Sequence, residues 1–385
     1  MEGFAKLLEG FMALNWGLLV MYAIGGTLIY LAIKKDYEPM LLLPIGFGAI
    51  LVNLPLSTVL SLDGDVGILQ VFYDKGILTE IFPLLIFIGI GAMTDFRPLF
   101  SNPRMIFFGA AAQFGIFLTI IAALAIGAAK PELGFDLKTA ASIGIIGAAD
   151  GPTSIFVASR FAPDWLGPIS VAAYSYMALV PIIQPPVVRA ITTKKERLIR
   201  MTYSERQVPK WIMVLFPIVV VIIAAIIAPI SAPLIGFLMF GNLLKESGVV
   251  ERLSSAAQNE LSNIVTIFLG ITIGSTMHYE KFLTVQTLII LGLGLVAFIF
   301  DTVGGVMFAK LMNLFTKNKV NPMIGAAGIS AFPMSARVIQ RMAKQEDPTN
   351  FILMQAVGAN VSGQLGSVIA GGIVLSLVPY LVGVM

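Results

Sequence analysis

Gly144-Ile-Ile-Gly-Ala-Ala-Asp-Gly-Pro-Thr-Ser154 interrupts an apolar segment, Thr139–Ala158, that is otherwise about as long as a membrane-spanning helix. The interruption contains a carboxylate, a proline and three glycines, and both glycine and proline weaken a helix. A carboxylate at bilayer depth costs about 2.5–3.5 kcal/mol on insertion scales. We therefore predict a broken, re-entrant segment whose freed carbonyls and Asp150 hold a cation. The alternative is a kinked helix with a neutralised carboxylate.

The composition is that of a membrane protein. The chain has 385 residues, 57% of them hydrophobic and 12% charged, whereas a soluble domain carries about twice that charge. It has no cysteine, which excludes disulfides and thiolate metal sites, and one histidine, His278, cannot build a zinc site. The net charge of +3 reflects orientation in a membrane and does not indicate a nucleic-acid partner. We predict an all-α polytopic membrane protein.

A basic linker divides the apolar segments into two sets. Residues 189–210 hold seven basic and two acidic side chains, and the excess of positive charge on cytoplasmic loops places this linker in the cytoplasm. The predicted organisation is an amphipathic helix at 1–14, a first membrane repeat at 15–188, the cytoplasmic linker at 189–210 and a second membrane repeat at 211–385.

The two sets resemble each other at a constant interval. Phe87-Ile-Gly-Ile-Gly91 is similar to Phe268-Leu-Gly-Ile-Thr272, and Pro152 is matched by Pro333. Both matches are 181 residues apart, an interval that holds over about 60 residues. Chance similarity between glycine-rich apolar stretches is the alternative to an internal repeat.

The basic loops indicate how the two copies are related. Loops at Lys34–Lys35, Arg97–Arg104 and Arg189–Lys210 should share the cytoplasmic side. Three apolar segments separate the second loop from the third, so one of them, Thr139–Ala158, has to be re-entrant. Each copy then has five crossings, and an odd number makes the repeats inverted in topology. In such folds broken helices from both repeats meet near the bilayer midplane and form the substrate and ion sites.

Polar residues within these segments form the candidate site. Asparagine and serine oxygens beside loosened glycine backbone suit Na⁺, with Asp150 as the countercharge. Tyr176 and Arg337 are further candidates for the site. Alternatively, Tyr176 is a packed aromatic side chain, and Arg337 is a charge that extends into solvent from the end of a segment. Asp95 and Asp301 rank lower because we expect them at helix ends.

Three motifs carry a family resemblance: Gly147-Ala-Ala-Asp-Gly-Pro-Thr153, Tyr174-Ser-Tyr-Met177 and Asn360-Val-Ser-Gly-Gln364. They resemble the β subunit of the sodium-pumping biotin-dependent decarboxylases, which act on oxaloacetate, methylmalonyl-CoA and glutaconyl-CoA. The resemblance extends from Gly46 to Gly372. It implies catalytic roles for Asp150, Tyr176 and Arg337, biotin contacts for Asn321, Ser330 and Arg337, and Na⁺ contacts for Asp150, Asn321, Gly325, Ser330 and Asn360.

The same resemblance implies a function as the membrane subunit of a primary sodium pump. It would act as the carboxybiotin decarboxylase of a multisubunit translocase in the bacterial cytoplasmic membrane, coupling decarboxylation to Na⁺ export. The implied partners are a carboxyltransferase α subunit, a biotin carrier protein, a small membrane γ/δ-type subunit and further copies of this chain. The acid that is decarboxylated would be chosen by the α subunit. The alternative is a secondary Na⁺-coupled carboxylate transporter of inverted-repeat architecture.

Overall fold

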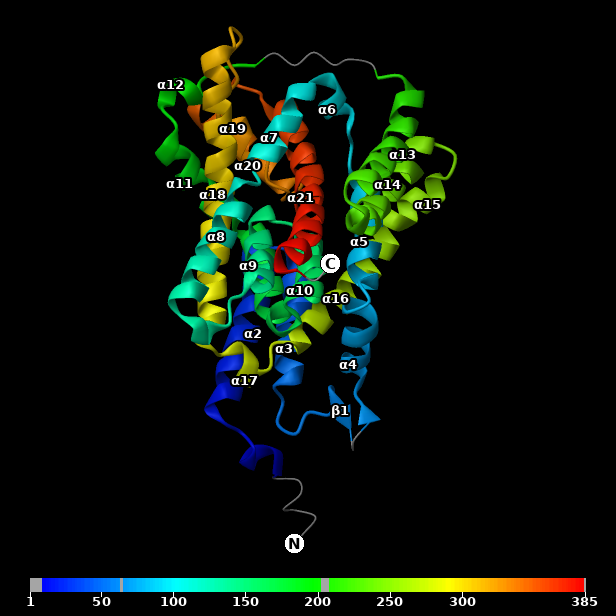
Figure 1. The fold of residues 1–385 in the computed structure, drawn as a ribbon, viewed down its shortest axis with the longest axis vertical. Coiled ribbons are helices and arrows are strands. Elements are labelled where there is room, and N and C mark those ends of the chain that lie inside the picture. Colours follow the sequence, from blue (N-terminus) through cyan, green and yellow to red (C-terminus); the bar gives the residue numbers. More distant parts are fainter. Residues whose placement is uncertain (1–8, 63–64, 202–207, 384–385) are drawn as a thin grey trace.

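The computed structural model describes residues 9–62, 65–201 and 208–383, and the chain is almost entirely helical (Figure 1). Up to the linker the elements are α2 (Trp16–Lys35), α3 (Pro39–Val52), β1 (Ser61–Leu62), β2 (Asp65–Val66), α4 (Ile68–Phe72), η1 (Tyr73–Ile77), α5 (Ile81–Met93), α6 (Arg97–Ser101), η2 (Pro103–Met105), α7 (Ile106–Ala111), α8 (Phe114–Ala129), η3 (Pro131–Leu133), α9 (Leu137–Gly144), η4 (Ile145–Ala148), α10 (Gly151–Phe161), η5 (Pro163–Trp165), α11 (Leu166–Ile191) and α12 (Lys194–Arg197). They continue with α13 (Lys210–Ile227), η6 (Pro229–Ser231), α14 (Ala232–Ser247), α15 (Glu251–Ala256), η7 (Ala257–Leu261), α16 (Ser262–Ser275), α17 (Tyr279–Phe282), α18 (Val285–Phe315), α19 (Met323–Ala326), α20 (Met334–Glu346) and α21 (Leu353–Val382).

The long helices confirm an all-α polytopic membrane protein. Within the described residues, five helical stretches are long and apolar enough to span a bilayer: 16–35, 103–129, 163–191, 285–315 and 353–382. A sixth is formed if α4–η1 and α5, bent by 60°, act as one span. β1 and β2 form a short antiparallel hairpin in the loop before α4. The predicted amphipathic helix at 1–14 falls largely on residues 1–8, outside the description.

Two crossed helix pairs connect the two sets of segments. Helix α3 packs on α16, and α5 packs on α14, so closely that a Cβ on Gly91 would collide with the Leu238 carbonyl. In each pair an asparagine fixes the partner's C-terminal end: Asn53 Nδ2 donates to the Met277 carbonyl (2.8 Å) and Asn242 Nδ2 to the Thr94 carbonyl (3.1 Å). This reciprocity agrees with two related copies, while their inverted topology stays a prediction.

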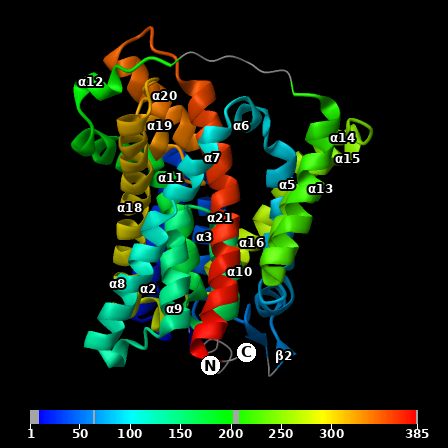
Figure 2. The ribbon, with the colours of Figure 1, turned by 45° about the horizontal axis from the view of Figure 1, so that its top comes forward.

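The remaining long helices surround two broken hairpins (Figures 1 and 2). Hairpin A is α9–η4–α10 and hairpin B is α19–α20. Helix α18 packs against α8, α11 and α19, and α21 packs against α7 and α20. The linker residues around α12 and the end of α20 lie together at one end of the molecule, at the top of Figure 1, which we call the linker end.

Asp301 corrects one prediction. Asp95 lies between α5 and α6 as expected and pairs with Arg97 (2.6 Å), but Asp301 is buried in the middle of α18 and does not mark a helix end. The apolar span 103–129 is interrupted between α7 and α8, and Asp301 Oδ1 accepts hydrogen bonds from the freed N–H groups of Gly115 (2.5 Å) and Ile116 (3.2 Å). A neighbouring helix N-terminus therefore stabilises the carboxylate, so α18 continues through it.

Candidate functional site

Hairpin A is broken at the predicted place. Asp136 caps α9 by accepting from the Thr139 N–H (2.8 Å). η4 ends at Ala148, and the next residue, Ala149, has a left-handed φ of 52°. Asp150 is then extended and caps α10, which begins with Gly151 and Pro152. A non-glycine residue in the left-handed region costs about 1–2 kcal/mol. The left-handed residue turns the chain sharply, and this turn leaves Asp150 at the tip of the hairpin, inside the protein.

Hairpin B meets it from the linker end. After the single turn of α19 the chain is irregular until α20 begins at Met334. The tips of the two hairpins touch, because the Ser330 N–H donates to the carbonyl of Ala148 (3.2 Å). Broken segments from the two sets thus meet, as predicted, and Ser330 makes the contact.

Four neutral polar side chains surround one oxygen of Asp150. Oδ2 is 2.7 Å from Thr153 Oγ1, 2.9 Å from Ser367 Oγ, 3.3 Å from Gln364 Nε2 and 3.5 Å from Ser330 Oγ. Each of the five side chains is at most 3% exposed. We call Asp150, Thr153, Ser330, Gln364 and Ser367 the Asp150 cluster. In the part of the chain that the structure describes, no basic side chain pairs with Asp150.

Asn360 lies one helical turn before Gln364 on α21. Its Nδ2 donates to the Ile329 carbonyl (2.7 Å), next to Ser330, whereas its buried Oδ1 has no hydrogen-bond partner among the described residues. The structure thus brings Asp150, Ser330 and Asn360 together, as the sequence led us to expect. It adds Thr153, Gln364 and Ser367. Thr153 lies within the Gly144–Ser154 segment that interrupts the helix. Gln364 and Ser367 follow Asn360 at helical spacing, and this spacing could have predicted them from the sequence.

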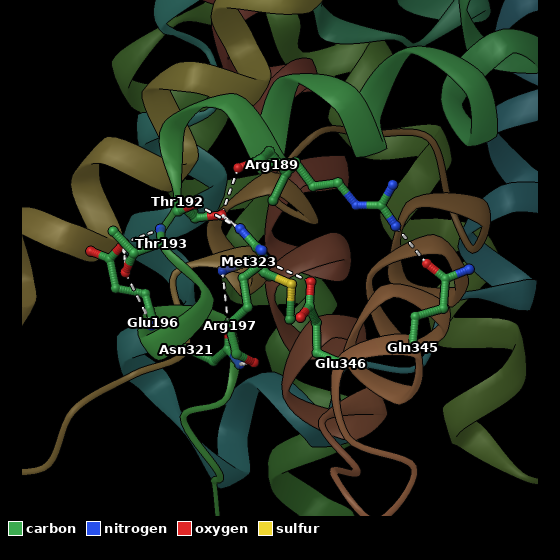
Figure 3. A network of polar contacts seen from close by, with 10 residues as sticks. Arg189, Thr192, Thr193, Glu196, Arg197, Asn321, Met323, Gln345 and Glu346 are labelled. Carbon is green, nitrogen blue, oxygen red and sulfur yellow. Dashed lines mark hydrogen bonds and ion pairs between the residues drawn. The ribbon is translucent and has the colours of Figure 1, made fainter.

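Asn321 and Gly325 lie elsewhere on hairpin B. Asn321 Nδ2 donates to the linker carbonyls of Arg197 (2.8 Å) and Ile199 (2.9 Å), as part of the network in Figure 3. Gly325 packs backbone to backbone on Gly305 of α18, where a Cβ on either glycine would overlap the carbonyl oxygen of the other. Asn321 therefore holds the linker, and Gly325 lets the hairpin approach α18.

Ion pairs at the linker end hold the linker to α18 and α20. Arg197 pairs with Glu346 (2.7 Å) and Lys310 with Glu196 (3.2 Å). The Thr349 hydroxyl and N–H, together with Arg200 (2.7 Å), lower the pKa of Asp347 to about 2. The Asp347 carboxylate is therefore charged at neutral pH and pairs with Arg200 of the linker at the end of hairpin B.

The other two predicted catalytic side chains, Tyr176 and Arg337, make no contact with Asp150 that the structure describes. Tyr176 Oη donates to the Leu291 carbonyl of α18, and Arg337 is exposed on the first turns of α20. The phenol beside the break belongs to Tyr174, whose ring covers Gly151 and whose buried hydroxyl has no partner in the described chain.

Known proteins resemble this chain over almost its whole length. Residues 17–378 match the family described as the Na⁺-transporting oxaloacetate decarboxylase beta subunit. The chain is 50% identical to the methylmalonyl-CoA decarboxylase subunit beta of Propionigenium modestum and 52% identical to the glutaconyl-CoA decarboxylase subunit beta of Acidaminococcus fermentans, with 96% of each chain covered in both comparisons. It is 46% identical to the oxaloacetate decarboxylase beta chain of Klebsiella pneumoniae, covering 98% of this chain and 99% of that one.

These similarities confirm the resemblance found in the sequence. They favour a membrane sodium pump over a secondary carboxylate transporter, and the relatives' names imply a decarboxylase built of several subunits. The chain belongs to the Na⁺-transporting oxaloacetate decarboxylase beta subunit family.

Proposed function

We propose that the Asp150 cluster is the Na⁺ site of this subunit. The observation that carries the proposal is a buried carboxylate, without a basic partner in the described chain, at the point where two broken hairpins and α21 meet. A buried charge needs a countercharge, and hydroxyl, amide and carbonyl oxygens are ligands for a hard cation. No group of three or more His, Cys, Asp or Glu that suits a multivalent ion occurs among the described residues. One carboxylate suits one monovalent ion.

Hairpin B links this site to the linker end. Asn321, at its start, is bonded to the linker, and Ser330, at its tip, reaches Asp150. A change in what the linker end binds therefore has a short, hydrogen-bonded route to the ion ligands. Such a route is what coupling between a reaction and ion transport requires.

The reaction we propose is decarboxylation of carboxybiotin, presented by a partner subunit. The bond between the ureido nitrogen and the carboxyl carbon breaks, CO₂ leaves, and the electron pair stays on the nitrogen, which takes up a proton. We assign Arg337 to the carboxylate, because a guanidinium binds it in a fork, Tyr176 to the proton, and Asn321 and Ser330 to contacts with biotin. Moving one Na⁺ outward against ~100 mV costs about 2.3 kcal/mol, which an exergonic decarboxylation supplies.

The proposed setting is the bacterial cytoplasmic membrane, with the linker 189–210 in the cytoplasm. A carboxyltransferase α subunit, a biotin carrier protein, a small membrane γ/δ-type subunit and further copies of this chain complete the complex. Inverted membrane vesicles containing the whole complex test the function. We expect ²²Na⁺ uptake to accompany CO₂ release and both to need Na⁺ and biotinylated carrier. The proposed function would be contradicted if CO₂ release did not depend on Na⁺, or if ²²Na⁺ uptake required only a carboxylate gradient.

Arg337→Lys keeps the charge and removes the fork, so we expect carboxybiotin decarboxylation by the complex to fall at least about tenfold, the loss of one charge-assisted hydrogen bond. Arg341→Lys, one turn further along α20 and also exposed, is the matched control. Equal activity of the two variants would show that the guanidinium of Arg337 has no special role.

Tyr176→Phe removes the phenol hydroxyl, with the proton that we assign to biotin and one hydrogen bond. That bond is worth about 1 kcal/mol of stability. If Tyr176 supplies the proton, turnover should fall by about 10²–10⁴-fold at saturating Na⁺. Tyr22→Phe is the control, because the Tyr22 hydroxyl also donates to a backbone carbonyl, that of Asn53 (2.9 Å), away from the cluster. Unchanged CO₂ release and ²²Na⁺ uptake in Tyr176→Phe would leave the proton to water.

A further inference from the structure

A cavity of about 580 Å³ opens at the linker end between three loops. Asn102, Arg104 and Met105 line it from the start of the α7 span, Ile199–Met201 from the linker, and Lys317–Val320 from the loop between α18 and α19. Its volume is within the range of about 300–1,000 Å³ typical of sites for small ligands.

The cavity is lined by charges of one sign. Arg104, Arg200, Lys317 and Lys319 all contribute to it, and none of its described lining residues is acidic. Arg200 is held from outside by Asp347 (2.7 Å), and Lys319 Nζ donates to the Asn313 carbonyl. Arg104 and Lys317 are exposed and form no hydrogen bond or ion pair with any side chain that the structure describes. A cleft lined in this way concentrates anions, and two of its cations are available to bind one.

The inner wall of the cavity leads into hairpin B. Val320 and Met201 line the cavity, and the next residue, Asn321, donates its N–H to Met201 Sδ (3.4 Å). Asn321 also holds the carbonyl of Ile199, another lining residue. An anion drawn into the cavity therefore contacts the loop from which hairpin B begins, and the tip of that hairpin carries Ser330 to Asp150.

We propose that this cavity is the docking site for the carboxylate of carboxybiotin as the carrier delivers it. The proposal rests on the proposed function and adds the place of arrival. Arg104 binds the carboxylate through its guanidinium and Lys317 as a point charge. The open cavity has the size of a small ligand and its lining continues into hairpin B. This favours a small carboxylate over the phosphate of an anionic lipid, which needs only a surface patch of basic side chains.

The test uses the purified complex with free carboxybiotin as the probe, so that tethering to the carrier does not mask a weakened affinity. Arg104→Ala and Lys317→Ala are each expected to raise KM about tenfold, with a larger rise in the double variant, because each removes one charge-assisted contact. kcat and the Na⁺ concentration for half-activation should change less than twofold, since neither residue is near the cluster contacts. Lys195→Ala, an exposed linker residue outside the cavity, is the control and should match wild type.

The outcomes separate this proposal from the proposed function. If wild type is active and the KM of the double variant is unchanged, the docking proposal is wrong and the proposed function is unaffected. A wild-type complex that does not decarboxylate carboxybiotin overturns the function itself. Binding of a lipid phosphate in the cavity is tested by measuring KM in vesicles of phosphatidylcholine alone and in vesicles with added phosphatidylglycerol. If the variants differ from wild type only when the anionic lipid is present, the cavity binds lipid phosphate and the docking proposal is wrong.

Discussion

Asp150→Asn is expected to abolish Na⁺-dependent decarboxylation and Na⁺ transport together. The substitution keeps the volume and removes the only charge in the Asp150 cluster, which the structure surrounds with neutral hydroxyl and amide groups. Loss of the ionic ligand should lower turnover at least about 100-fold, equivalent to about 2.7 kcal/mol of transition-state free energy. CO₂ release by the complex and ²²Na⁺ uptake into inverted vesicles measure the two activities side by side.

A second N-cap in the same hairpin provides the control. Asp150 caps α10 by accepting from the Thr153 N–H (3.4 Å), and Asp136 caps α9 in the same way (2.8 Å). Asparagine caps a helix about as well as aspartate, so both substitutions preserve the caps. If Asp150 served only to cap α10, Asp150→Asn would be as harmless as Asp136→Asn. Normal activity with the same Na⁺ dependence in both variants would make the carboxylate structural.

Gly325→Ala is expected to weaken Na⁺ activation of the complex by shifting hairpin B. A methyl group there would overlap the Gly305 carbonyl oxygen of α18. Because that obstacle is backbone, the hairpin has to move, and overpacking of this kind costs about 1–3 kcal/mol. The movement is passed to Ser330, five residues along the same hairpin. We expect a lower Tm and at least a tenfold rise in the Na⁺ concentration that half-activates the complex.

Gly292→Ala is the matched control for Gly325→Ala. Gly292 lies on the same helix as Gly305, and a Cβ there would meet nothing within 4 Å. It should leave Na⁺ activation unchanged and stabilise α18 slightly, since alanine is a better helix former than glycine. Equal Na⁺ activation in Gly325→Ala and Gly292→Ala would show that close approach to α18 does not position the site.

The broken hairpin was predictable because its cause is local. Glycines, Pro152 and Asp150 destabilise a helix wherever they occur in succession, and the structure breaks there. That broken segments from both sets should meet followed from matching Pro152 with Pro333, whereas Ser330 was named by the family resemblance. Gln364 and Ser367 depended on which face α21 turns toward the hairpins, and a helix that is apolar almost all round gives little periodic signal for that.

Other positions were decided by tertiary contacts that the sequence does not encode locally. We expected Asp301 at a helix end because a charge in an apolar span is costly, but the N–H groups freed between α7 and α8 bind its Oδ1. Tyr174 and Tyr176 are two residues apart and so lie on different faces of α11. Which of them faces the break depends on how α11 is rotated against α18, to which Tyr176 is bonded. The family resemblance implied an ion contact for Asn321, and the structure shows its amide bonded to the linker.

Equilibrium binding of ²²Na⁺ to the purified complex, without carboxylated substrate, tests the Asp150 cluster most directly, because it requires no catalysis. Wild type is predicted to bind Na⁺ saturably and in competition with unlabelled Na⁺. Asp150→Asn is predicted to lose that binding while it keeps the same subunit composition and a Tm close to wild type in Na⁺-free buffer. Saturable binding of equal affinity and amount in Asp150→Asn would contradict the assignment of the Asp150 cluster as the Na⁺ site.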